Sequence, residues 1–141
     1  NEALPEVVLS NIEKDKKVFG VISLVEDSNT VREVTHGKIT SILAPAKQAA
    51  GDERLWINSL GEGAIMVSNY NGNLENGDYI TTSPIEGVGM KQNDDLLHNY
   101  TVAKIVQDCN FTQNKQYIVG SITHNGVVYK TALVGCTYHC G

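Results

Sequence analysis

The sequence has little of what membrane and nucleic-acid functions require. No apolar run approaches the roughly 20 residues that span a bilayer, and no window gathers Lys and Arg side chains. The 16 acidic residues outnumber the 11 basic ones, which gives a formal net charge of −5. We therefore expect neither nucleic acid nor a membrane as a partner, because phosphates bind to clustered cations.

Catalytic and cofactor motifs are also missing. There is no Gly-x-Ser-x-Gly nucleophile elbow, and Gly87-Val88-Gly89 lacks the third glycine and the Lys-Ser/Thr pair of a phosphate loop. The four histidines lie in turn-like or terminal contexts, and Asp78, Asp94 and Asp95 are typical of solvated turn carboxylates. The sequence therefore predicts no cofactor and assigns no catalytic residue.

Helix formers accumulate only in residues 44–50, where Pro45 and Gly51 bracket barely two turns. Such a short segment favours a surface loop. After Lys91, Asn93-Asp94-Asp95 fits either the cap of one helical turn over Leu96-Leu97-His98 or a loop. The chain thus predicts little or no helix.

Short apolar or alternating runs fill the rest of the chain. The longest, Val18–Val25, predicts a buried central strand, with Gly20 marking a bulge or a close backbone approach. Around Asn125-Gly126, the runs 117–123 and 127–134 predict a β-hairpin, because both turn residues tolerate positive φ. Further strands are expected at residues 7–9, 31–34, 38–43, 55–60, 64–68, 79–82 and 101–106.

Residues 61–91 organise these strands. Asn69, Asn71, Gly72, Asn73, Asn76 and Gly77 form a turn cluster between the strands at 64–68 and 79–82, and Pro84, Gly87 and Gly89 close the second strand. Because the apolar residues here cannot form a core alone, neighbouring strands must cover one face. We expect residues 1–141 to form a single all-β domain, a barrel or sandwich of about eight to ten short antiparallel strands.

The densest group of metal-type ligands is Cys136-Thr137-Tyr138-His139-Cys140. Cys136, His139 and Cys140 could bind zinc with a fourth ligand from Cys109, His36, His98 or His124. A disulfide among Cys109, Cys136 and Cys140 and buried free thiols are the alternatives. Because the cysteines number three, at least one is unpaired.

Several segments together resemble a known family. They are Val18–Ser23, Gly61–Ala64, Asn73–Ser83 and Gly87–Lys91, with the end of the chain, Ala132–Gly141. The first four resemble the C-terminal β domains of phage and large-virus appendage proteins, above all the intramolecular-chaperone autoproteolytic cleavage domain of phage neck appendages, which belongs to a G-type peptidase family. The last is similar to the ends of predicted proteins of large algal viruses.

The resemblance implies a structural assembly or attachment domain, homotrimeric, at the C-terminal end of a longer fibrous chain. It places the protein in a virion or outside the cell, in contact with other virion proteins or a host surface glycan. In some relatives such a domain cuts its own chain once, so a single-turnover peptidase is the first alternative. The second is a glycan-binding module, with Trp56, Tyr70 and Tyr79 as candidate ligand-binding residues beside Asn-rich turns.

Overall fold

The computed structural model describes residues 6–26, 32–36, 39–43 and 54–140. These residues form an all-β fold without a helix, as the sequence predicts, and none of them belongs to a helix that could cross a membrane. The strands are β1 (Val21–Glu26), β2 (Arg32–His36), β3 (Ile39–Leu43), β4 (Arg54–Asn58), β5 (Leu60–Ser68), β6 (Tyr79–Thr82), β7 (Gly89–Lys91), β8 (Thr101–Ile105), β9 (Ile118–His124) and β10 (Val127–His139).

The chain divides into two compact units, of which the first comprises Asn1–Val7 and Ile22–Ile57. It holds two small sheets, β1 paired with β4 and β2 paired with β3. β2 and β3 are antiparallel, with Arg32 opposite Leu43 and His36 opposite Ile39. This confirms the strands expected near residues 31–34 and 38–43, whereas the loop predicted at 44–50 lies outside the described residues.

Two predictions near the N-terminus are wrong. The apolar run Val18–Val25 is not a buried central strand: β1 begins only at Val21 and pairs with one strand, and Phe19 and Ile22 are exposed. A continuous apolar run is buried only where both of its faces are covered. Residues 7–9 form no strand either, and the chain continues from them as irregular structure.

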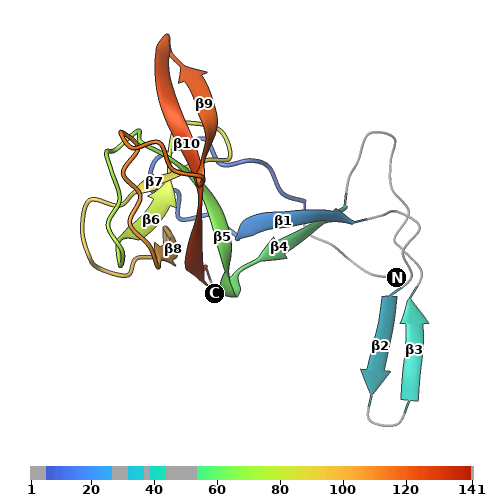
Figure 1. Ribbon diagram of the computed structural model, residues 1–141. Helices are drawn as coiled ribbons and strands as arrows, with labels where there is room; N and C mark the ends of the chain where they lie inside the picture. The colour runs from blue at the N-terminus through green and yellow to red at the C-terminus, as the bar shows by residue number, and fades with distance from the viewer. Residues whose placement is uncertain (1–5, 27–31, 37–38, 44–53, 141) are drawn as a thin grey trace. The chain divides into compact units, whose positions relative to one another are not determined.

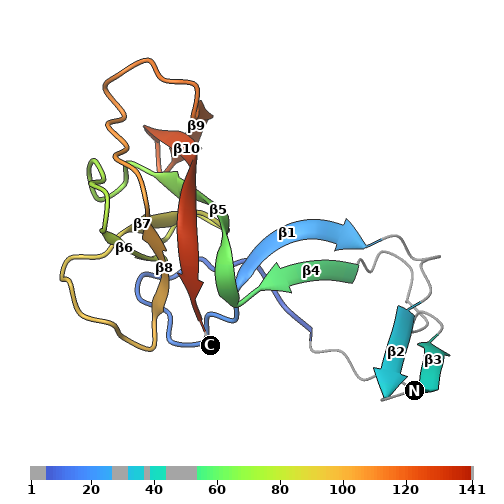
Figure 2. The same cartoon turned by 60° about the horizontal axis from the view of Figure 1, so that its bottom comes forward.

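The second unit, Val8–Val21 and Asn58–Gly141, contains a closed sheet. Its strand order is β5-β7-β6-β8-β10-β9, and a further pairing joins β10 to β5. That pairing, seen side by side in Figure 2, closes β5, β7, β6, β8 and β10 into a small barrel. Because β5 and β10 lie far apart in sequence, only long-range pairing decides between barrel and sandwich.

Alternation along β10 builds one wall of the core. Every second side chain from Ala132 to Tyr138 is buried, and Val134 lies opposite Ile65 while Ala132 lies opposite Val67. With residues of β6 and β8 and the loop residues Leu74, Cys109 and Phe111, these side chains form the main hydrophobic cluster. The period of two residues thus places one face of β10 inside the barrel.

Tyr138 depends on a glycine across the sheet. A Cβ atom at Gly63 would collide with the Tyr138 hydroxyl, so only glycine leaves room for this ring. The hydroxyl accepts a hydrogen bond from the Ala64 amide at 3.0 Å and donates one to the Ala64 carbonyl at 2.7 Å. One side chain of β10 therefore satisfies both backbone groups of a residue in β5.

The stretch 61–91 folds largely as predicted. β5 and β6 flank a turn region in which Gly72 and Gly77 both have a φ of +97°. Gly89, expected to end the preceding strand, instead begins β7, which pairs with β6 antiparallel and with β5 at Val67. A Cβ at Gly89 would meet Ile80 and backbone oxygens, so the glycine permits the close approach of these strands.

Residues 10–15 of the N-terminal segment run beside the end of β6. The Thr82 hydroxyl donates to the Ile12 carbonyl at 2.7 Å and accepts from the Asp15 amide at 2.8 Å. The Gly87 amide donates to the Ser10 carbonyl at 2.8 Å. The first two of these bonds satisfy the hydroxyl of Thr82, which is buried.

The predicted C-terminal hairpin is confirmed. β9 and β10 are antiparallel around Asn125 and Gly126, whose φ angles of +50° and +79° are those of a two-residue type I′ turn. β10 is 13 residues long, and its first part pairs with β9 while a later part pairs with β8 on the same edge. In Figure 1 the hairpin projects beyond the barrel strands.

Candidate functional site

The most concentrated group of polar contacts lies in the loop between β7 and β8, residues 92–100. The structure resolves the two sequence alternatives here in favour of a loop, since residues 93–98 form no helical turn. Gln92 leaves β7 and Thr101 begins β8, and both side chains are buried. Because these two residues belong to the barrel wall, they fix both ends of the loop to a rigid element.

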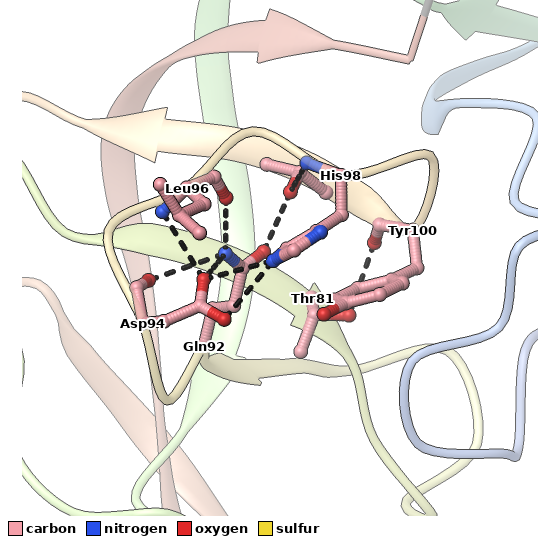
Figure 3. A network of polar contacts seen from close by, with 7 residues as sticks. Thr81, Gln92, Asp94, Leu96, His98 and Tyr100 are labelled. Atoms are coloured by element: carbon pink, nitrogen blue, oxygen red, sulfur yellow. Dashed lines mark hydrogen bonds and ion pairs between the residues drawn. The ribbon is translucent and has the colours of Figure 1, made fainter.

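Gln92 is the centre of this network (Figure 3). Its Nε2 donates to the Leu96 carbonyl at 2.7 Å, to Asp94 Oδ1 at 2.9 Å and to the Asp94 carbonyl at 3.2 Å. Its Oε1 accepts a hydrogen bond from the Thr101 hydroxyl at 2.6 Å. One buried amide thus satisfies its hydrogen-bonding capacity inside the loop, which a buried polar group requires.

His98 and Asp94 form an ion-pair geometry at the outer side of the loop. His98 Nε2 lies 3.0 Å from both carboxylate oxygens of Asp94, and its ring stacks on Tyr100 with a centroid distance of 4.5 Å. The hydrogen bond from His98, with that from the Leu96 amide, lowers the pKa of Asp94 below its ordinary value. These hydrogen bonds therefore favour the ionised form of Asp94.

A histidine beside a carboxylate could serve a nucleophile as a general base. The Thr101 hydroxyl in this network donates a hydrogen bond to Gln92 and accepts one from the backbone amide of His98 at 3.0 Å. Among the described residues, no hydroxyl or thiol is hydrogen-bonded to the His98 ring. The arrangement therefore acts as a clamp that fixes the loop, and Asp94 and His98 are part of that clamp.

The three aromatic candidates for ligand binding are divided between the two units. Trp56 lies on β4 in the first unit and is 48% exposed. Tyr70 and Tyr79 lie in the second unit, half-buried, in separate ring contacts: Tyr70 with Tyr129 and His124, Tyr79 with His139. Of the three candidates for glycan binding, Trp56 is exposed, whereas the rings of Tyr70 and Tyr79 contact other protein rings.

Around Tyr79 the structure reveals a polar row that the sequence did not indicate. Tyr79 of β6 pairs with Lys104 of β8, and Lys104 pairs with Thr137 of β10. The Lys104 ammonium lies 5.9 Å from the Tyr79 ring centroid, and Thr137 Oγ1 lies 3.0 Å from His139 Nε2. Because these residues come from three distant segments, only strand register brings them together.

Cys109 and Cys136 lie in the core, and the half-buried Cys140 packs against it. Cys109, Cys136 and Cys140 are free thiols, so the disulfide considered from the sequence is not formed. Burial raises the pKa of each of the three thiols to about 11. Cys140 donates a hydrogen bond to the Val102 carbonyl at 3.5 Å, and no group of three or more potential metal ligands gathers within the described ranges.

Gln92 and Thr101 are the residues that sequence reasoning missed. A glutamine in a polar stretch after a short strand carries no signal of burial in a single sequence. The sequence indicates Asp94 and His98 only as a solvated turn carboxylate and a solvated or core-edge histidine in a turn-like context. Their four-residue separation within a loop, unlike the same spacing on a helix, does not predict contact.

Comparison with protein-family models, with curated proteins and with solved structures finds no match for this chain. The assignment of a function therefore depends on the surfaces and contacts described above.

Proposed function

We propose that this chain is a structural domain that assembles as a homotrimer, at the C-terminal end of a fibrous appendage protein of a virion. The observation that carries the self-assembly is apolar surface outside the barrel core. In the second unit, exposed large apolar side chains lie on β5, β9, β10 and the segment after β8: Leu60, Val106, Val119, Val127, Val128 and Leu133.

Exposed apolar side chains on neighbouring strands are typical of interaction surfaces, and β9 and β10 carry four of these residues, Val119, Val127, Val128 and Leu133. β9 adds a second feature, because it is the last strand in the sheet order and one of its edges lacks a strand partner among the described residues. Proteins protect such edges with charges, prolines or covering segments. The sequence of β9, IVGSITH, contains neither a proline nor an acidic or Lys/Arg side chain.

The chemistry of the polar loop supports a structural role. Its central amide, hydroxyl and carboxylate groups are hydrogen-bonded to one another and to the backbone, as Figure 3 shows. This arrangement holds the loop in place on the barrel without presenting an activated nucleophile. The virion and appendage parts of the proposal come from the resemblance of residues 18–23, 61–64, 73–83, 87–91 and 132–141.

The test is the mass of the folded chain in solution, by sedimentation equilibrium over a wide concentration range. We expect three times the chain mass of 15.3 kDa. A monomer at every concentration would contradict the proposal. A second experiment tests the peptidase alternative by measuring the intact mass of the product expressed from a longer parent gene. Two fragments from that gene, and a single uncut chain once Ser and Thr residues near the junction are changed to Ala, would indicate self-cleavage.

A further inference from the structure

The part of the hairpin beyond the barrel, residues 118–128, has apolar side chains on both of its faces. Val127 is 50% and Val128 is 64% exposed, and successive residues of a strand point to opposite faces. Val127 pairs with His124, and the next pair on this face is Tyr129 with Ile122. The other face carries Val128 opposite Thr123. The next pair on that face is Lys130 with Ser121, so each face presents one exposed valine near the turn, and further apolar side chains follow it on the Val127 face.

The first of these faces continues into an aromatic group. The Tyr70 ring lies 5.1 Å from the Tyr129 ring and 6.3 Å from that of His124, measured between centroids. All three rings are half-buried, so part of the group reaches the surface. Tyrosine in a neutral, partly apolar setting is typical of the centre of protein interfaces.

Charge distribution indicates which partner fits. No residue from 116 to 129 is Asp, Glu, Lys or Arg, although these types make up 19% of the chain. With a formal net charge of −5, two copies carry the same overall sign of charge. At this hairpin they can approach without juxtaposing like charges, whereas a partner recognised by charge would find nothing here to bind.

We propose that the β9–β10 hairpin is the contact through which three copies of this chain associate, with the hairpins gathered around a threefold axis. This rests on the proposed homotrimer. Around a threefold axis each hairpin meets one neighbour with its Val127 face and the other neighbour with its Val128 face. A twofold contact is isologous and would use a single face, which would leave the other valine exposed.

The decisive experiment places a charge on each face separately. Val127→Glu and Val128→Glu each place one unpaired carboxylate in every one of the three contacts, so we expect either one to raise the dissociation constant of the trimer at least about a hundredfold. Sedimentation equilibrium measures this constant. Far-UV circular dichroism and the urea midpoint check that the dissociated variants stay folded, since neither side chain belongs to the barrel core.

Two variants serve as controls. Leu96→Glu adds the same charge at a side chain that is 64% exposed, equal to Val128, but lies on the loop between β7 and β8. It should leave the trimer intact. Val128→Ile keeps an apolar β-branched side chain and should also leave the dissociation constant unchanged within about threefold, because an apolar swap of similar shape costs little.

The outcomes separate the two proposals. A trimer that survives both valine variants, or that Leu96→Glu weakens equally, would overturn the hairpin contact and leave the homotrimer standing. A dimer, or loss of assembly in only one of the two valine variants, would overturn the threefold arrangement in which both faces are used. A wild-type chain that is monomeric throughout would overturn the hairpin contact and the proposed function together.

Discussion

Strand β10 passes through two different environments. In residues 131–139 it pairs with β5, and alternate side chains such as Val134 and Cys136 enter the barrel core. In residues 127–130 it pairs with β9 alone, and its side chains there are exposed or half-buried. The apolar residues of the two parts are of the same types. The comparison teaches that neighbouring strands, and not the residues of β10 themselves, decide which of its side chains stabilise the fold.

The sharpest test of this comparison makes the same change in both parts of β10. Val134→Ala should lower the free energy of unfolding by about 2 to 3 kcal/mol, because it removes buried methyl groups and leaves a cavity. Val128→Ala should lower it by less than about 0.5 kcal/mol. Urea denaturation in a Val127→Glu background keeps self-association out of the measurement. Equal losses at both positions would refute the distinction.

Two glycines extend the comparison to the strands that pair with β10. Gly63→Ala should cost about 2 kcal/mol, because its Cβ displaces the Tyr138 hydroxyl from Ala64. Gly120→Ala, on β9, places its Cβ 3.7 Å from Thr131 Oγ1, an ordinary contact, and should change the stability by less than about 0.5 kcal/mol. Thermal unfolding of both variants measures the difference in stability between them. If Gly63→Ala leaves the stability unchanged, the barrel wall can shift to accommodate the added methyl group.

A smaller effect is expected at the hairpin turn. Gly126→Ala forces a side chain onto a φ of +79° and should cost about 1 kcal/mol. Asn125→Gly, at a φ of +50°, keeps the turn type and should be nearly neutral. Chemical denaturation measures both. A full loss of folding in Gly126→Ala would mean that the hairpin, and not the barrel, limits stability.

The smallest effect concerns a region held by polar contacts instead of burial, the loop of Asp94 and His98. Since its bond with His98 lowers the folded pKa of Asp94 below the ordinary 3.8, the resulting stabilisation is present above pH 3.8. It is lost as the pH falls through the lower folded pKa. Asp94→Asn should therefore speed amide hydrogen exchange in residues 93–100 relative to wild type at neutral pH.

The same comparison at acid pH completes this prediction. Once the pH has fallen below the folded pKa of Asp94, the wild-type loop should exchange as fast as that of Asp94→Asn. Asp95→Asn removes the neighbouring carboxylate, which lacks the bond to His98, and should match wild type throughout. Identical exchange in wild type and Asp94→Asn at neutral pH would show that the clamp depends on Gln92 alone.

Local signals were enough for much of the fold. Asn125-Gly126 predicted the hairpin because few residues adopt positive φ, and alternation at Tyr79–Thr82 located β6 with its observed bounds. The close spacing of short apolar and alternating runs, with almost no helical pattern, also predicted an all-β chain. The buried central strand at Val18–Val25 was wrong because hydrophobicity measures a tendency to be buried, whereas burial itself needs a covering neighbour.

The candidate site was much less predictable. Asp94 and His98 could be recognised as polar loop residues, but not as partners, and Gln92 gave no signal at all. Their contacts depend on how the loop between β7 and β8 folds back on the barrel wall. Likewise, the row of Tyr79, Lys104 and Thr137 exists only because three distant strands share one register.

The sequence by itself determined the strand-rich character of the chain, the hairpin turn and the absence of charge from residues 116–129. Each of these is a property of neighbouring residues. Tertiary structure alone decided the closure of the barrel through β5 and β10, the place of Gly63 under Tyr138, and the burial of Gln92. These features depend on pairing between segments far apart in the chain. Alternation of apolar and polar residues determines which face of a strand is buried, but not which strand lies beside it.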